Sequence, residues 1–139
     1  MPAGCAFCAI RDGRAPAAMV LDEEGAFAFL DVRPLFPGHV LVVPRQHHAT
    51  LLDLPDPEVG PFFSVVRRVA AAVTTSMAAQ GTFVAANNVV SQSVPHLHLH
   101  VVPRTKGDGL RGFFWPRTRY ATDADMAAVA TRIRSSIAS

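Results

Sequence analysis

The amino-acid sequence predicts an α+β fold, in which several antiparallel strands are combined with one long helix and a C-terminal helix. Three observations predict it. Between residues 17 and 44, short apolar runs are separated by glycine, proline and acidic residues, as in strands joined by turns. Between residues 56 and 80, apolar residues recur every three or four positions, as on one face of a helix. From Val94 to Arg104, histidines alternate with apolar residues, as in a strand with two different faces.

The length of 139 residues suits one domain and is short for two. We therefore expect a single domain over residues 1–139, in which residues 104–139 form a C-terminal loop and helix. The chain has no run of about 18 uncharged apolar residues and no recognisable signal peptide, so we expect a cytoplasmic protein without a membrane span. The net charge of +2 does not indicate nucleic-acid binding.

The only two cysteines, Cys5 and Cys8, are separated by two residues. In a reducing compartment this spacing favours metal binding or redox chemistry over a structural disulfide. A redox pair usually follows a strand, and no strand is expected before residue 5, so we prefer metal binding. Zinc takes four ligands, and histidines are the candidates for the other two. His47 or His48 is one candidate.

The first two strands are expected as a hairpin over residues 17–22 and 26–31, with Gly25 in the turn. In the second strand, Phe29 and Asp31 share one face with Phe27. Asp31 could accept hydrogen bonds from a ribose while the rings contact a base, or it could cap the following turn. The residues by themselves favour the turn cap.

Residues 37–44 predict a third strand, which is almost wholly apolar and therefore central and covered on both faces. His39 enters this strand after the turn at Gly38. Taken alone, such a histidine is more often structural than catalytic.

A long amphipathic helix is expected over residues 56–80, with Asp56 as its cap, Pro57 in its first turn and Gly81 at its end. We interpret its apolar stripe as core packing without a functional role. The stripe consists of Val59, Phe62, Phe63, Val66, Val69, Ala70, Val73 and Met77.

A fourth strand over residues 82–87 leads into a polar loop over residues 88–93. Such a loop could bind a phosphate, although a plain hairpin loop explains it nearly as well. After the histidine strand, residues 104–119 contain Trp115 and several basic residues against one acid, Asp108. A polyanionic ligand and an ordinary solvated loop explain this charge equally. The basic residues are Arg104, Lys106, Arg111, Arg117 and Arg119.

The C-terminal helix is expected over residues 122–137, with Thr122 as its cap. Its apolar face would consist of Met126, Val129, Ile133 and Ile137.

His96, His98 and His100 lie at every second position, so one face of the expected strand carries them. The other face carries Leu97, Leu99 and Val101. We expect the apolar face to pack against the core and the imidazole face to be held open for chemistry. A solvated strand with histidines of no function and a three-histidine metal site are the alternatives.

Together these motifs resemble the histidine-triad (HIT) family of nucleotide-binding proteins, in its bacterial Hint-like branch. The resemblance covers the chain from Cys5 to about Arg104. It rests on separated segments in the family's order: Cys5–Cys8, Ala28–Asp31, Pro37–His47, Gln92–Val94 and His96–His100. It implies a five-stranded antiparallel sheet with helices, usually assembled as a homodimer.

The resemblance further implies a nucleotide hydrolase that acts at an α-phosphate. His98 would attack the phosphorus and form a covalent nucleotidyl-histidine, which water would then hydrolyse. His100 would donate to phosphate oxygens or the leaving group, and His39 would support the nucleophile. Asp31 would bind the ribose hydroxyls, which replaces its interpretation as a turn cap. The other nucleotide contacts would be Phe7 and Phe29 near the base, Gln92 and Ser93 at the phosphate, and Asn87 or Asn88 as the substrate-contacting asparagine.

In zinc-containing members of the family, the cysteine pair is joined by two histidines. Carried over to this chain, the ligands are Cys5, Cys8, His47 and His96. Such a set leaves no open position, so the Zn²⁺ would be structural. This ligand set removes the three-histidine metal site from consideration.

The implied substrates are purine nucleotides such as AMP or GMP conjugates, either nucleoside phosphoramidates or dinucleoside polyphosphates. His100, rather than a glutamine, favours hydrolysis over the transferase branch. Compared with the family, the loop between Asn87 and Gln92 is short, and Ser91 replaces a common glycine, so the phosphate preference stays open. A nucleotide-binding module with little turnover and a nucleic-acid end-deadenylating enzyme are alternatives. A nucleic-acid partner is not expected, because no DNA-binding segment follows.

Overall fold

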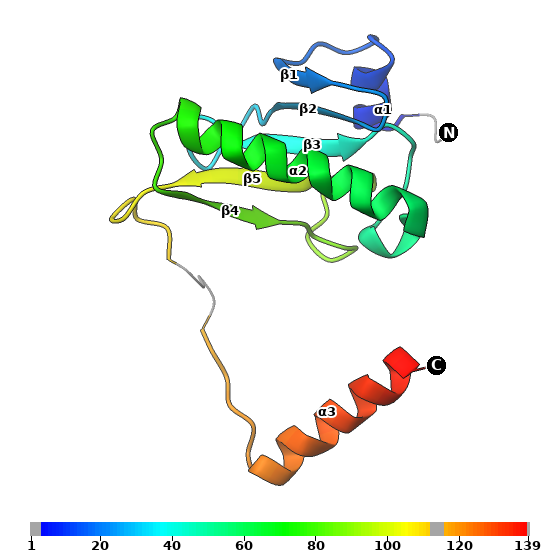
Figure 1. The fold of residues 1–139 in the computed structure, drawn as a ribbon, viewed down its shortest axis with the longest axis vertical. Coiled ribbons are helices and arrows are strands. Elements are labelled where there is room, and N and C mark those ends of the chain that lie inside the picture. The colour runs from blue at the N-terminus through cyan, green and yellow to red at the C-terminus, as the bar shows by residue number, and fades with distance from the viewer. Residues whose placement is uncertain (1–3, 112–115, 139) are drawn as a thin grey trace. The chain divides into compact units, whose positions relative to one another are not determined.

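The computed structural model describes residues 4–111 and 116–138 (Figure 1). Trp115 of the basic loop lies outside the described residues. The chain divides into two compact units, Met1–Asp108 and Gly109–Ser139, and the single-domain organisation over residues 1–139 stays a prediction. Among the described residues, none of the helices combines the length and the apolar character needed to cross a bilayer.

The first unit is built on a five-stranded antiparallel sheet, which confirms the predicted fold class (Figure 1). The strand order is β1-β2-β3-β5-β4, so β3 lies in the middle and all five of its residues are buried, as expected for a central strand. The predicted hairpin is formed by the first two strands, with Gly25 in the turn. The strands are β1 (Met19–Asp22), β2 (Ala26–Leu30), β3 (Val40–Pro44), β4 (Gly81–Ala85) and β5 (Leu99–Arg104).

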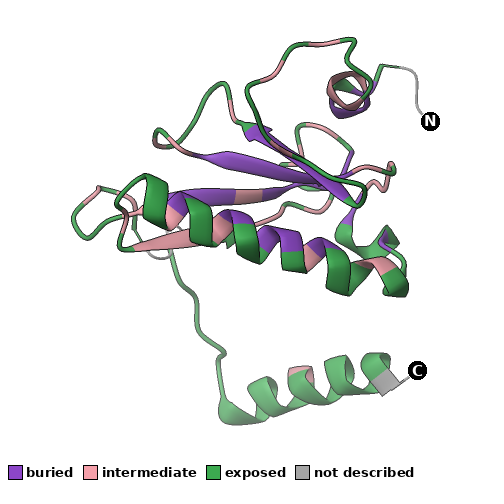
Figure 2. Cartoon of the chain, turned by 45° about the horizontal axis from the view of Figure 1, so that its top comes forward, coloured by how far each residue is buried: buried purple, intermediate pink, exposed green. Residues whose placement is uncertain are grey.

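The long helix α2 (Asp56–Ser76) packs its apolar stripe against one face of the sheet, as Figure 2 shows by the buried residues along its inner side. Its predicted cap and end are both wrong. The N-cap is Pro55, and Asp56 instead lies in the first turn, where a carboxylate favours the helix dipole. The helix ends at Ser76. It cannot extend to Gln80, because the Gln80 N–H donates to the Arg104 carbonyl at 3.0 Å and so pairs with the sheet instead of the helix.

The histidine strand is shorter than predicted, because regular pairing begins only at Leu99. The alternation nevertheless holds, since Leu97, Leu99 and Val101 are buried in the core beneath α2. The expectation of an open imidazole face is wrong for His96, whose exposed fraction is 0%, whereas His98, which is 5% exposed, lines a cavity. A short helix that the sequence did not predict, α1 (Ala6–Arg11), packs on that side of the sheet with Phe7 and Cys8 buried.

The second unit contains helix α3 (Asp123–Ala138). Thr122 caps it as predicted, because its Oγ1 accepts a hydrogen bond from the Asp125 N–H at 3.0 Å. The predicted apolar face is largely exposed at Met126, Ile133 and Ile137.

Gly38 directly precedes the candidate site residue His39, at the point where the chain enters β3. Replacing Gly38 should therefore strain the backbone next to that residue. The φ of +96° at Gly38 lies in the left-handed region, and a Cβ atom built there would lie 2.7 Å from Cγ of Met77. We expect Gly38→Ala to lower the free energy of unfolding by about 1–3 kcal/mol, measured by urea denaturation. Gly25→Ala is the control, because a Cβ atom at position 25 would have no neighbouring atom within 4 Å.

The double variant Gly38→Ala/Met77→Ala removes the steric part of this effect and leaves the backbone part. It should therefore lose less stability than the two single effects added together. Equal effects of Gly38→Ala and Gly25→Ala would contradict the assignment of strain to Gly38.

Candidate active site and metal site

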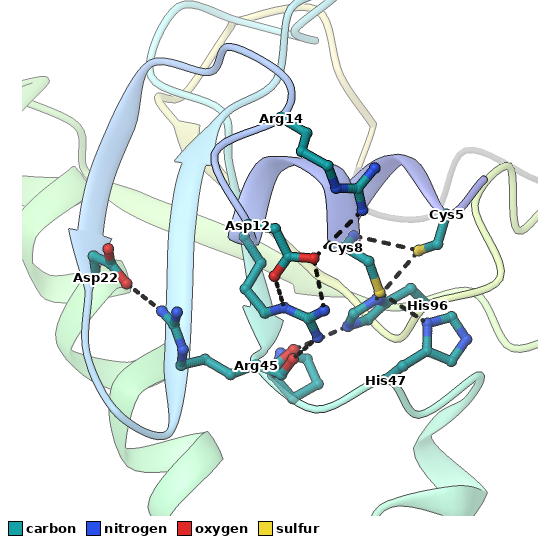
Figure 3. Close-up of polar contacts among 10 residues, drawn as sticks. Cys5, Cys8, Asp12, Arg14, Asp22, Arg45, His47 and His96 are labelled. Carbon is teal, nitrogen blue, oxygen red and sulfur yellow. Dashed lines mark hydrogen bonds and ion pairs between the residues drawn. The ribbon is translucent and has the colours of Figure 1, made fainter. Parts of the chain in front are cut away.

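Four predicted metal ligands meet where α1 contacts the loop before β5. The ligand atoms of Cys5, Cys8, His47 and His96 all lie within 4.8 Å of one another, and Figure 3 shows these side chains pointing together. The distance from Cys5 Sγ to His96 Nδ1 is 3.5 Å, and Cys8 Sγ lies 3.5 Å from His47 Nδ1 and 3.6 Å from His96 Nδ1. With Zn–S near 2.3 Å and Zn–N near 2.0–2.1 Å, a tetrahedral zinc site separates sulfur and nitrogen by about 3.6 Å.

Hydrogen bonds in this cluster leave the correct atoms available to a metal. The Nε2–H of His96 donates to the Pro44 carbonyl at 2.9 Å, and burial lowers the pKa of His96 to about 4. The ring is therefore neutral near pH 7, and its Nδ1 lone pair faces the sulfurs. His47 likewise bonds to the backbone of Pro95. The four residues fit a tetrahedral zinc ion, whereas His48, the other candidate, bonds to Glu58 at 3.2 Å.

The first turn of α1 holds the sulfur atoms. Cys5 is the N-cap of this helix, and its Sγ accepts a hydrogen bond from the Cys8 N–H at 3.4 Å. Burial raises the pKa of the Cys8 thiol, and the hydrogen bond and charge of Cys5 raise it further. A bound cation would offset this cost of forming thiolates.

His98 lies immediately beside this cluster and has its own hydrogen-bond pattern. Its Nδ1–H donates to the His96 carbonyl at 2.7 Å, and burial lowers its pKa. A neutral imidazole carries one proton, so Nε2 of His98 is the nitrogen with the free lone pair. The ring of Phe7 meets the ring of His98 edge-on, with centroids 4.9 Å apart.

His39, which directly precedes β3, and His100 in β5 form a histidine pair. Their side chains are joined by a hydrogen bond of 3.0 Å between His39 Nε2 and His100 Nδ1. Burial, followed by the charges of His98 and His39, lowers the pKa of His100 to about 4. Burial also lowers the pKa of His39, and the charge of Asp31 partly opposes this. Both rings are therefore neutral near pH 7.

Asp31 combines the two roles that the sequence left as alternatives. Its Oδ1 accepts a hydrogen bond from the Arg33 N–H at 2.9 Å, so it does cap the turn after β2. Its Oδ2 lies 3.7 Å from His39 Nε2 and therefore faces the histidine pair. The turn cap orients the carboxylate without using both of its oxygens.

Six of the predicted site residues line one cavity of about 230 Å³. Its walls are mainly apolar, and its polar side chains come from one acid, one arginine (Arg33), one serine and two histidines. The predicted residues are Phe7, Phe29, Asp31, Ser93, His98 and His100. Sequence reasoning missed the other lining residues, which are Ile10, Pro16, Ala17, Leu30, Val32, Arg33, Leu41 and Val94. Most of these belong to α1 or to loops, where no periodic pattern marks a pocket.

Asn87 and Gln92 lie outside this lining. Gln92 Nε2 donates to the Ala49 carbonyl at 2.6 Å, and Gln92 Oε1 accepts from the Val89 N–H at 3.0 Å. Asn87 Nδ2 donates to the Ser91 carbonyl at 3.3 Å. These bonds hold the loop before β5, and contacts of either side chain with a nucleotide stay predictions.

The chain is similar to a known domain family and to several proteins of that family. A family model described as the HIT domain matches residues 12–107. An adenosine 5′-monophosphoramidase of Candida albicans is 30% identical over 129 residues, which is 88% of this chain and 84% of that protein. A HIT family structure from Bacillus subtilis has a TM-score of 0.86 at 30% identity and covers 96% of each chain.

A zinc-bound histidine triad family protein from Mycobacterium smegmatis is 36% identical, with a TM-score of 0.73, and covers 95% of this chain and 97% of that one. The family model spans well over half of the chain, and the phosphoramidase matches along most of both proteins. The chain therefore belongs to the HIT, or histidine triad, domain family.

Proposed function

We propose that this protein is a nucleotide hydrolase that cleaves AMP or GMP conjugates at the α-phosphate. Nucleoside phosphoramidates and dinucleoside polyphosphates are the two substrate classes. The observation that carries the proposal is the hydrogen bond from His98 Nδ1–H to the His96 carbonyl, because it leaves Nε2 unprotonated beside the cavity. The similarity to an adenosine 5′-monophosphoramidase supports the same class of reaction.

In the first step, His98 Nε2 would form a bond to the α-phosphorus. The bond from phosphorus to the leaving group breaks, and the leaving group keeps the electron pair and takes a proton from solvent. The His98 ring becomes positively charged, and its Nδ1–H remains bonded to the His96 carbonyl. Water then attacks the phosphorus and loses a proton to solvent, and the bond from phosphorus to His98 Nε2 breaks. Its electron pair returns to the ring, which becomes neutral again, and the nucleoside monophosphate is released. This converts one displacement at phosphorus into two easier ones.

The other cavity residues would bind the nucleotide rather than react with it. His100 would donate a hydrogen bond to the charged phosphoryl group, and His39 would hold His100 in place. Phe7 and Phe29, whose centroids are 5.4 Å apart, would contact the base, and Asp31 Oδ2 would accept from the ribose. Ser93 would contact the phosphate. To contact the nucleotide, Asn87 and Gln92 would have to break the hydrogen bonds that they make to the Ser91 and Ala49 carbonyls.

Replacing the nucleophile tests this function. We expect His98→Ala to lower kcat/KM for adenosine 5′-phosphoramidate by more than about 1,000-fold, because the attacking nitrogen is lost. Rapid alkaline quenching and mass spectrometry should find an adenylyl adduct on His98 of the wild type. His48→Ala is the control, since His48 bonds to Glu58 outside the cavity. Wild-type turnover no faster than that of His98→Ala would instead indicate a nucleotide-binding module.

Zinc bound by Cys5, Cys8, His47 and His96 is the second part of the proposal, and its role would be to hold α1 on the sheet. The sulfur–nitrogen distances and the free Nδ1 of His96 support it. Elemental analysis of the protein purified without added metal should find about one zinc per chain.

A cysteine variant provides the matched comparison. Cys8→Ala should abolish zinc retention and lower the Tm, while His48→Ala should keep the metal. Zinc-free wild type with the same Tm before and after addition of zinc would contradict a structural metal.

The proposed assembly is a homodimer in the cytoplasm. Strand β4 is an edge strand of the described sheet, and Val84 on it is exposed, so a second copy could add there. Light scattering after size exclusion should give twice the mass of one chain. A monomer at micromolar concentration would contradict the dimer but leave the chemistry of the site unaffected.

A further inference from the structure

We propose that the backbone amide of Leu35, acting through His39, fixes the tautomer of His100 so that His100 presents an N–H to the phosphate of a bound nucleotide. Leu35 and His39 are then positioning residues. The consequence for catalysis rests on the proposed function, whereas the tautomers themselves do not.

The direction of the first hydrogen bond is not ambiguous. The Leu35 N–H lies 3.1 Å from His39 Nδ1, and a backbone amide nitrogen can only donate. His39 Nδ1 must therefore be the unprotonated nitrogen of its ring. Because the buried ring is neutral near pH 7, its one proton is on Nε2.

The hydrogen bond between His39 and His100 then determines the tautomer of His100. His39 Nε2–H donates to His100 Nδ1 at 3.0 Å, so Nδ1 of His100 is an acceptor and its proton lies on Nε2. His98 has the opposite tautomer, because its Nδ1–H donates to the His96 carbonyl. Two histidines on the same cavity thus offer different groups to a ligand: a lone pair at His98 and a hydrogen-bond donor at His100.

The turn that contains Leu35 is itself fixed by the backbone. The His39 N–H donates to the Phe36 carbonyl at 3.1 Å, and the His39 carbonyl accepts from the Asp31 N–H at 2.9 Å. Leu35 is 53% exposed as a residue, and it contacts His39 through its backbone amide.

The hydrogen bond from the Leu35 N–H to His39 also argues against a metal site at Asp31, His39 and His100. Ligand atoms of Asp31, His39 and His100 lie within 4.8 Å of one another, as in a metal site. A metal there would need the Nε2 lone pair of His39, the nitrogen facing both other residues. The Leu35 N–H leaves Nε2 protonated, so the group is arranged for hydrogen bonding and not for metal binding.

The tautomers can be measured directly in the wild-type protein. Long-range ¹H–¹⁵N NMR near pH 7 should show the proton on Nε2 in His39 and His100 and on Nδ1 in His98. A proton on Nδ1 of either His39 or His100 would overturn the proposal. The measurement needs no turnover, so its result is independent of the proposed reaction.

Binding of two product-like ligands tests the consequence. Asparagine at position 39 can accept from Leu35 but cannot reach His100, whereas glutamine can place an amide near the position of Nε2. We expect His39→Asn to weaken AMP binding by about tenfold or more, because one hydrogen bond to a charged group is lost. Adenosine, which lacks the phosphate, should bind with unchanged Kd, and His39→Gln should restore much of the AMP affinity.

Equal losses for AMP and adenosine would show a merely structural role for His39 and would refute the proposal. Leu35→Pro removes the amide donor and should reproduce the selective loss, while Leu35→Ala keeps the donor and should bind AMP like the wild type. Normal AMP binding by folded Leu35→Pro would also refute it. If the wild type hydrolyses no substrate but passes these tests, the proposed function fails and this inference stands.

Discussion

The hydrogen bond from His98 to the carbonyl of His96 joins the candidate active site to the candidate metal site. His96 directs its Nδ1 toward the two cysteine sulfurs and its Nε2–H toward Pro44, while its carbonyl sets the tautomer of the candidate nucleophile. A single buried residue therefore belongs to the candidate metal site through its ring and to the candidate active site through its backbone. A displacement of His96 would disturb both sites together.

Helix α1 adds a second connection between the two sites. Phe7 lies between Cys5 and Cys8 in the sequence, and its ring contacts those of His98 and Phe29. The cysteine pair thereby positions one wall of the cavity as well as two candidate ligands. The motif Cys5–Cys8 and the candidate site residue His98, which are far apart in the sequence, are therefore connected by direct packing.

Much of the fold could be predicted because burial follows local patterns. The alternation around Leu97 and Leu99 correctly indicated which face packs against the core. Contacts between distant segments left no such pattern. Helix α1 depends on long-range packing, and α2 ends early because Gln80 already pairs with Arg104. The six residues that do line the cavity were named from the resemblance, whereas the loop bonds of Gln92 could not be read from residue types.

The sequence could not predict which ring nitrogens of the histidines in this site carry protons. The groups that set them belong to the backbone: carbonyls of Pro44, Pro95 and His96, and the N–H of Leu35. Almost any residue supplies such groups, so residue identity at these positions carries little information about the tautomers. Proline is the informative exception, because it offers a carbonyl but no N–H. It is therefore compatible with the acceptor positions 44 and 95 and incompatible with the donor position 35.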